Sequence, residues 1–182
     1  MKTWILNGSP RKDGNTAYLI EQLVRRLDGE SKIFFAYDSV ASPCIDCRYC
    51  WNHDGCSLDD EMQEVYKEIE ASDNIVLASP IQFMGLSAPL LCVASRFQRY
   101  YAARKFRKTE LFAMPKKGAF ILTAGGDGGA KYAGAVARLI LKEVGADCLS
   151  YAMSLRTDVL PSRNDQKVLE EIGKMAKILN GA

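Results

Sequence analysis

Residues 2–16 read KTWILNGSPRKDGNT, and this stretch decides the fold. The run at 2–7 is short and mostly apolar, and Gly8 ends it, which is typical of a buried β-strand. A helix is expected directly after it, because apolar residues recur at the spacing of one helical face: Ile20, Leu23, Val24 and Leu27. Asn15 or Thr16 is the expected N-cap. The chain thus begins as strand, polar loop and helix.

The same alternation continues along the chain. Further strands are expected at 31–37, 74–79, 118–123 and 148–153, and helical faces recur at about 59–69, 87–101, 136–144 and 168–179. The strands centred on Ile5, Val76 and Ile121 are apolar on both faces, as in a parallel sheet covered by helices on both sides. We therefore predict an α/β fold of three layers, α/β/α, that forms one domain over residues 1–182.

Composition and charge narrow the class of protein. The chain has 182 residues, of which 48% are hydrophobic and 25% charged, which fits a globular domain and excludes a disordered chain, a coiled coil or a collagen. The net charge of +2 gives little attraction to nucleic acid or to an anionic membrane, so neither is an expected partner. No apolar run is long enough for a membrane span, and the N-terminus does not read as a signal peptide, so a cytoplasmic location is expected.

The loop after the first strand has the composition of a phosphate site. It offers hydroxyl, amide and guanidinium donors, from Ser9, Arg11, Asn15 and Thr16, and it leads into a helix N-terminus whose dipole favours an anion. It matches neither GxxxxGK[ST] nor GxGxxG, so a nucleoside triphosphatase or a standard dinucleotide fold is not supported. In doubly wound domains ligands bind beyond the carboxyl ends of the strands, where this loop lies. The alternative is a polar turn with an ordinary helix cap.

The motif NGSPRxxGNT at 7–16 resembles the phosphate loop of the flavodoxin-like NAD(P)H-dependent FMN reductases. Asp60-Glu61-Met62 and Ser79-Pro80-Ile81-Gln82-Phe83, together with a cysteine-rich loop at about 40–58, are similar to the branch that includes the iron–sulfur flavoproteins. The resemblance covers nearly the whole chain. It implies a flavodoxin-like, five-stranded parallel sheet of order 2-1-3-4-5, with FMN as cofactor and NAD(P)H as co-substrate.

The resemblance also implies roles by position. The FMN phosphate would be held by Ser9, Arg11, Asn15 and Thr16. The ribityl chain and the isoalloxazine ring would lie against Pro80, Ile81, Gln82, Phe83, Met84 and Gly85, and the other edge of the ring against Thr123, Ala124, Gly125 and Gly126. Gln82 stands where the family usually has Tyr, and Leu91 where it often has Lys. No residue is assigned a catalytic role, because the flavin carries the chemistry.

Four of the six cysteines follow a C-x2-C-x2-C-x5-C pattern, at Cys44, Cys47, Cys50 and Cys56. Four thiolates on a compact loop are what a [4Fe–4S] cluster needs, and the spacing resembles that of the iron–sulfur flavoproteins. Two alternatives stay open: a structural zinc ion, which also takes four thiolates, and free or reversibly oxidised thiols. The remaining two, Cys92 and Cys148, are expected in the core.

The leading hypothesis is an FMN-dependent oxidoreductase that passes reducing equivalents from NAD(P)H through FMN to a small-molecule acceptor, such as a flavin or a quinone. A variant with the cluster would transfer single electrons with a ferredoxin-like protein. The alternative is a catalytically weak, flavodoxin-like redox-sensing or binding module. Basic residues gather at 96–117, where a solvated loop or a subunit contact is favoured over recognition of the NADPH 2′-phosphate. The resemblance implies a homodimer or a homotetramer.

Overall fold

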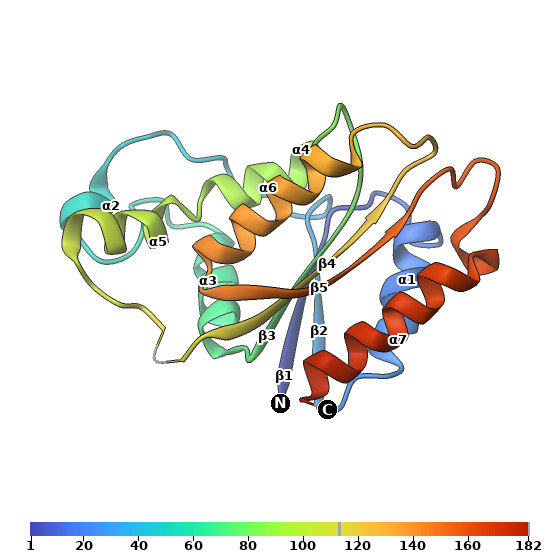
Figure 1. Cartoon of the computed structure of the whole chain (residues 1–182). Helices are drawn as coiled ribbons and strands as arrows, with labels where there is room; N and C mark the ends of the chain where they lie inside the picture. The colour runs from blue at the N-terminus through green and yellow to red at the C-terminus, as the bar shows by residue number, and fades with distance from the viewer. Residues whose placement is uncertain (113, 182) are drawn as a thin grey trace.

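The structure, a computed structural model, describes residues 1–112 and 114–181. Its centre is a sheet of five parallel strands in the order β2-β1-β3-β4-β5 (Figure 1). The strands are β1 Lys2–Asn7, β2 Glu30–Phe35, β3 Asn74–Pro80, β4 Lys116–Thr123 and β5 Ala146–Ser154. The predicted strand order and the flavodoxin-like fold are confirmed, and every strand begins and ends within two residues of its predicted bounds.

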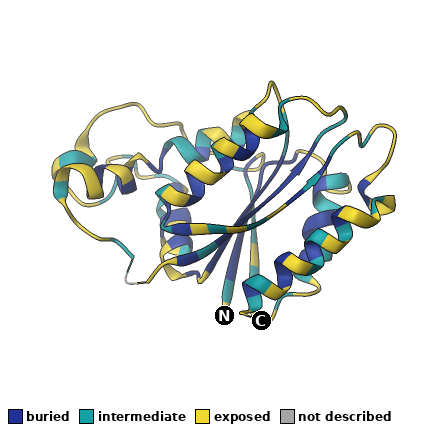
Figure 2. Ribbon diagram, viewed as in Figure 1, coloured by how far each residue is buried: buried dark blue, intermediate teal, exposed yellow. Residues whose placement is uncertain are grey.

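Successive strand residues point to opposite faces of the sheet and so build two separate cores. One face, with Ile5, Val76 and Ile121, packs against α1 (Asn15–Val24) and α7 (Gln166–Asn180). The other face is covered by three helices: α3 Met62–Ala71, α4 Ala88–Ser95 and α6 Ala130–Glu143. The central strands are therefore buried on both sides, as Figure 2 shows.

The helix expected at 87–101 is divided into two. After α4 the N–H groups of Arg96 and Phe97 bond to carbonyls three residues earlier, which tightens the chain before α5 (Gln98–Ala102) begins. A π-helical turn, η1 (Ala103–Arg107), continues from α5 where irregular chain was expected. One helix followed by two short helical segments, α5 and η1, therefore replaces the single long helix that was expected.

The loops that carry the predicted site residues all lie at one edge of the sheet. Because the strands are parallel, the segments after β1, β3, β4 and β5 leave from the same edge, the last of them running into the short helix η2 (Ser162–Asn164). The cysteine-rich loop follows β2 and contains a short helix, α2 (Tyr49–Asn52), which lies beside α5 and η1 (Figure 1). No helix in the described parts of the chain has the length and apolar character to cross a membrane.

Candidate functional site

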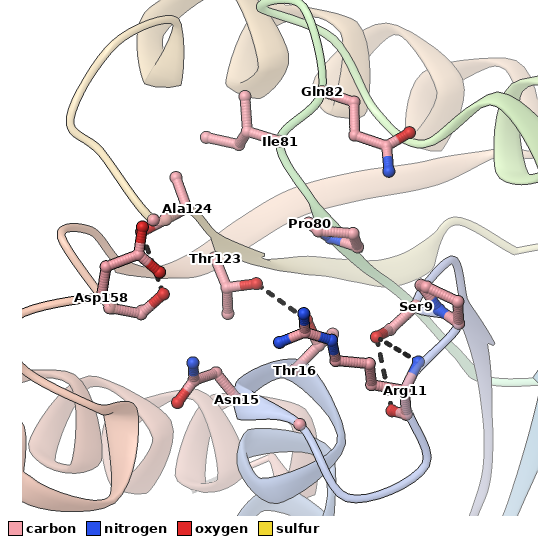
Figure 3. A pocket seen from close by; sticks show the side chains of 14 residues that line it. Ser9, Arg11, Asn15, Thr16, Pro80, Ile81, Gln82, Thr123, Ala124 and Asp158 are labelled. Carbon is pink, nitrogen blue, oxygen red and sulfur yellow. Dashed lines mark hydrogen bonds between the residues drawn. The ribbon is translucent and has the colours of Figure 1, made fainter.

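A pocket of about 400 Å³ lies where the loops after β1, β3, β4 and β5 meet (Figure 3). Its volume is in the range of small-molecule and cofactor sites. It brings together these predicted site residues: Ser9, Arg11, Asn15, Thr16, Pro80, Ile81, Gln82, Thr123, Ala124 and Gly125. They come from three segments that are far apart in the sequence, so the pocket is a product of the strand order.

The loop after β1 is folded by its own polar groups. Oδ1 of Asn7 accepts the N–H of Ser9 (2.9 Å), and Oγ of Ser9 accepts the N–H of Arg11 (3.3 Å). The loop ends at Gly14, which is the N-cap of α1 and has no side chain to occupy the first amides of the helix. The first turn of α1 contains no acidic residue either. The positive end of this helix is therefore available to an anion in the pocket.

Asn15 and Thr16 are the first residues of α1, not the N-cap that the sequence predicted, because Gly14 supplies the extended backbone before the helix. Their side chains hold other segments in place. Oδ1 of Asn15 accepts the N–H of Ser162 (2.9 Å), which turns its amide nitrogen toward the pocket (Figure 3). The hydroxyl of Thr16 is hydrogen-bonded to that of Thr123 (2.8 Å), the last residue of β4. Both contacts fix segments of the pocket wall.

The loop after β5 adds residues that the motifs did not indicate. Thr157 and Asp158 line the pocket, as do Pro10 and Gly14. Figure 3 shows Asp158 beside Ala124, on the side opposite Ser9. A Cβ at Gly125 would collide with Oδ2 of Asp158 and lie 2.8 Å from its Cγ, so the glycine permits this close approach. The strand order could have indicated these residues, because they follow a fifth parallel strand whose carboxyl end lies at the same edge of the sheet as the others.

Four predicted residues do not line the pocket: Phe83, Met84, Gly85 and Gly126. Gln82 and Gly85 are paired by two backbone hydrogen bonds of 3.0 and 2.9 Å, which closes a tight turn between them. Phe83 and Met84 both adopt left-handed backbone (φ 47° and 64°), and this turn carries their side chains into solvent. Gln82 itself remains in the pocket wall.

All four loop cysteines line a second, smaller pocket: Cys44, Cys47, Cys50 and Cys56. They are free thiols, the first two exposed and the others partly buried, around a partly open pocket of about 40 Å³. Within the described residues, no three Cys, His, Asp or Glu side chains surround a point that could hold a single metal ion. The other two cysteines, expected to be buried in the core, are only partly buried: Cys148 packs against the core, and Sγ of Cys92 faces the carbonyl of Ala41 (3.5 Å) at the edge of the loop.

The thiols of the second pocket differ in acidity. The thiol of Cys47 is hydrogen-bonded to the hydroxyl of Ser57 (3.1 Å), and this bond lowers the pKa of Cys47 below the ordinary thiol value. Burial raises the pKa of Cys50, and the negative charges of Cys56, Cys44 and Cys47 raise it further. Because like charges oppose one another, an occupant that binds all four as thiolates must supply positive charge.

Two buried arginines form the inner wall of the cysteine pocket. Arg96 is bound by the carboxylate of Asp60, with Nη1–Oδ2 and Nη2–Oδ1 distances of 2.7 and 3.1 Å. Arg99 lies over the ring of Tyr66 (4.4 Å to the centroid) and pairs with Glu70 (3.3 Å). Burial opposes the charge on Asp60, but the hydrogen bonds from Arg96 and from the backbone hold the pKa of Asp60 below its ordinary value. The ionised carboxylates of Asp60 and Glu70 therefore balance the two buried arginines, and the pocket lining itself contains Arg48, Arg96 and Arg99 beside a single carboxylate, Asp46.

Known proteins resemble this chain in sequence. A family model described as NADPH-dependent FMN reductase matches residues 1–157. An iron–sulfur flavoprotein of Methanocaldococcus jannaschii is 33% identical over 99 residues, which cover 53% of this chain and 51% of that protein. An iron–sulfur flavoprotein of Methanosarcina thermophila is 30% identical over 129 residues, with coverages of 69% and 64%. The chain thus spans about half to two thirds of the length of these curated relatives.

Solved structures resemble it in fold. The NAD(P)H:quinone oxidoreductase of Methanothermobacter marburgensis superposes with a TM-score of 0.73 at 14% identity, covering 98% of this chain and 96% of that one. An FMN-dependent NADH-azoreductase of Bacillus anthracis, solved in complex with FMN, gives a TM-score of 0.66 at 14% identity, with coverages of 99% and 100%. These likenesses show the flavodoxin-like fold. Since the family model extends over residues 1–157, the chain belongs to the NADPH-dependent FMN reductase family.

Proposed function

We propose that residues 1–182 form a single FMN-binding domain of a cytoplasmic, flavin-dependent oxidoreductase. It takes reducing equivalents from NAD(P)H and passes them to a small-molecule acceptor such as a flavin or a quinone. One observation carries the proposal: the loops after β1, β3 and β4 meet around a pocket of about 400 Å³ at the uncapped N-terminus of α1. Bound FMN supplies the redox chemistry there, so the residues of the chain have to bind and orient it.

The residues present fit such a ligand. Ser9, Arg11 and the first amides of α1 would hold the phosphate, because they gather hydrogen-bond donors and positive charge at one end of the pocket. The segment 80–82 and the loop after Thr123 would line the remainder of the flavin. Gly125 leaves room for the backbone to approach closely, and Thr16 holds Thr123 in place.

The experiment compares FMN with riboflavin, which lacks the phosphate. Wild-type apoprotein is titrated with each, and binding is followed by quenching of flavin fluorescence. Substitution Arg11→Met should weaken FMN by about 10- to 100-fold, as expected for one charged hydrogen bond, and should leave riboflavin unchanged. Lys12→Met is the matched control, because Lys12 pairs with Asp38 (3.2 Å) and does not line the pocket.

A wild-type protein that takes up no FMN from excess would contradict the proposal. If Arg11→Met weakened FMN and riboflavin binding equally, the phosphate would not be bound by Arg11. Bleaching of the bound flavin by NADPH or NADH, measured anaerobically, tests the donor. Failure of both nucleotides to bleach it would favour a redox-sensing module over an enzyme.

We further propose that Cys44, Cys47, Cys50 and Cys56 hold a [4Fe–4S] cluster that exchanges single electrons with a ferredoxin-like protein. All four line one pocket whose lining also contains three arginines, Arg48, Arg96 and Arg99, and these oppose the negative charge of four thiolates. In such a cluster each thiolate binds a different iron atom. The sulfur atoms therefore stand further apart than around a single zinc ion, for which the described residues offer no ready arrangement. The curated relatives named iron–sulfur flavoproteins support the same reading.

The cluster proposal is tested on protein purified without oxygen, by its absorption spectrum and by iron, sulfide and zinc analysis. About four iron atoms per chain are expected. Cys50→Ser should lose them, whereas Cys148→Ser, whose thiol is outside the pocket, should keep them. Flavin absorption with neither iron nor zinc would contradict the cluster and leave the FMN proposal intact. One zinc per chain would assign the cysteines to a structural site.

We propose that the protein is a homodimer or homotetramer that assembles through the outer side of α4 and α6. Helix α4 has no charged residue and exposes Leu91, and Tyr101 and Leu139 are exposed at a groove between α4, α5 and α6. Leu139→Glu should reduce the mass measured by light scattering, because it places a charge in this contact. Leu149→Glu, on edge strand β5 and about equally exposed, is the control. An unchanged mass in Leu139→Glu would place the contact elsewhere.

A further inference from the structure

Arg96 holds both ends of the cysteine-rich loop from inside the molecule. Its side chain is 1% exposed, which is unusual for an arginine. Nη1 donates to the carbonyl of Ser42 (2.9 Å), just before the first cysteine, and to Oδ2 of Asp60 (2.7 Å), just after the last. Nη2 donates to Oδ1 of the same carboxylate (3.1 Å). The guanidinium thus has a fixed position relative to the loop, set by a bidentate pair.

The same guanidinium reaches a cysteine sulfur. Nη2 of Arg96 lies 3.4 Å from Sγ of Cys56, and both residues line the cysteine pocket. In the parts of the chain that the structure describes, the buried Nε of Arg96 has no acceptor. A buried N–H without a partner is costly. Arg96 therefore retains hydrogen-bonding capacity beyond its bonds to Ser42, Asp60 and Cys56.

We propose that Arg96, acting through Cys56, raises the reduction potential of the group that the four cysteines hold, and that Asp60 moderates this effect. The inference rests on the cluster proposed above. On reduction one electron enters from reduced flavin or another one-electron donor, no bond forms or breaks, and the site becomes more negative by one charge. A cation that donates to a ligand sulfur stabilises this reduced form more than the oxidised one. A carboxylate at the same place does the opposite.

Arg96 is therefore a positioning residue with an electrostatic role, and the two roles are separable. Loss of a merely structural clamp would release iron in both Arg96 and Asp60 variants. An electrostatic role shifts the midpoint potential in opposite directions, because Asp60 neutralises part of the positive charge that Arg96 presents to Cys56. The test is an anaerobic potentiometric titration of the iron-loaded protein, followed by absorption and by electron paramagnetic resonance.

Arg96→Gln should lower the midpoint potential enough to change the reduced-to-oxidised ratio about tenfold at a fixed potential, equivalent to about 59 mV for one electron. Arg96→Lys keeps the positive charge but loses the two-pronged guanidinium, so its midpoint potential should lie between those of Arg96→Gln and the wild type. Asp60→Asn should raise the potential. Arg99→Gln is the matched control, because Arg99 lines the same pocket but pairs with carboxylates and rests on Tyr66 instead of a sulfur; its shift should be smaller.

Equal shifts for Arg96→Gln and Arg99→Gln would overturn the proposal, because a general field would then explain both. Unchanged potentials in iron-loaded Arg96→Gln and Asp60→Asn would overturn it too, while the cluster itself would stand. If Arg96→Gln does not take up the cluster, the midpoint potentials of Arg96→Lys and Asp60→Asn test the proposal in its place. If none of the three holds iron, these residues serve only to fold the loop, which also overturns the proposal. A wild type without iron would remove the cluster first, and this inference with it.

Discussion

Oγ1 of Thr16 lies 2.8 Å from Oγ1 of Thr123, so the first turn of α1 is hydrogen-bonded to the last residue of β4. Both side chains are buried, and the two residues lie on the wall of the same pocket. The contact joins segments 107 positions apart in the sequence. It sets the distance between the phosphate end of the pocket and the loop that follows β4.

Removal of one of these hydroxyls should cost more than removal of both. Thr16→Val or Thr123→Val alone leaves a buried hydroxyl without its partner, at about 1–3 kcal/mol of unfolding free energy, whereas the double variant removes the donor and the acceptor together. Urea denaturation of the two single variants and the double variant gives the coupling energy directly. Strictly additive losses would mean that the contact contributes little.

Gly125 and Gly126 provide a matched pair for the pocket. A methyl group at Gly125 meets the carboxylate of Asp158, whereas none of the described residues comes within 4 Å of one at Gly126. Gly125→Ala should weaken FMN by about tenfold, or about 1.4 kcal/mol, and Gly126→Ala should leave it nearly unchanged. Folding stability should change little in either, because the end of a flexible side chain can move. Fluorescence titration measures both.

Asp158→Ala provides the check on that cause. Combined with Gly125→Ala, it removes the group that the new methyl meets, so the double variant should bind FMN better than Gly125→Ala alone. If the double variant binds FMN no better, the loss arises from the backbone loop itself and not from contact with Asp158.

The positions of the loops could be predicted from the sequence because each follows a buried strand directly. Gly8, Pro80 and Ala124 all come after apolar runs, and in a parallel sheet such strand ends share one edge. That reasoning brings Ser9 and Thr123 to one pocket although no local signal connects them.

What the sequence could not show depends on backbone angles and on partners far along the chain. Phe83 follows directly on the pocket segment, yet its left-handed φ carries the side chain into solvent. Asp158 belongs to a loop without a motif, and it lines the pocket close against Gly125, where a side chain would collide with it. Arg96 sits on a helix end where arginine is usually exposed, and its burial depends on Asp60, 36 residues earlier.

The thiols of the metal-free protein should react in a defined order. The hydrogen bond with Ser57 lowers the pKa of Cys47, whereas burial and the neighbouring thiolates raise the pKa of Cys50. Cys47 is therefore the more ionised of the two at pH 8. It should therefore be alkylated first by iodoacetamide, as followed by peptide mass spectrometry. Ser57→Ala should slow Cys47 and leave Cys44 unaffected. Faster reaction of Cys50, or no effect of Ser57→Ala, would contradict this assignment.

Glu68 should make the stability of the fold depend on acid. Its carboxylate pairs with Lys32 (2.7 Å) and Lys2 (2.9 Å), and the hydrogen bond from Lys32, with Lys2 adding to it, holds the pKa of Glu68 below its ordinary 4.5. Because the folded pKa is the lower one, the stabilisation is complete above the unfolded pKa and disappears as the pH falls through the folded value.

Glu68→Gln should therefore lower the free energy of unfolding at pH 7 by up to about 1 kcal/mol, and the difference from the wild type should vanish in acid below the folded pKa. Denaturant titrations of both proteins between neutral pH and about pH 3 measure it. Glu64→Gln is the control, since Glu64 is more exposed and stands 3.8 Å from the same Lys32, so it should change stability less at every pH. If the stability difference between Glu68→Gln and the wild type persisted unchanged in acid, it would arise from packing, because a protonated carboxyl no longer forms the ion pair.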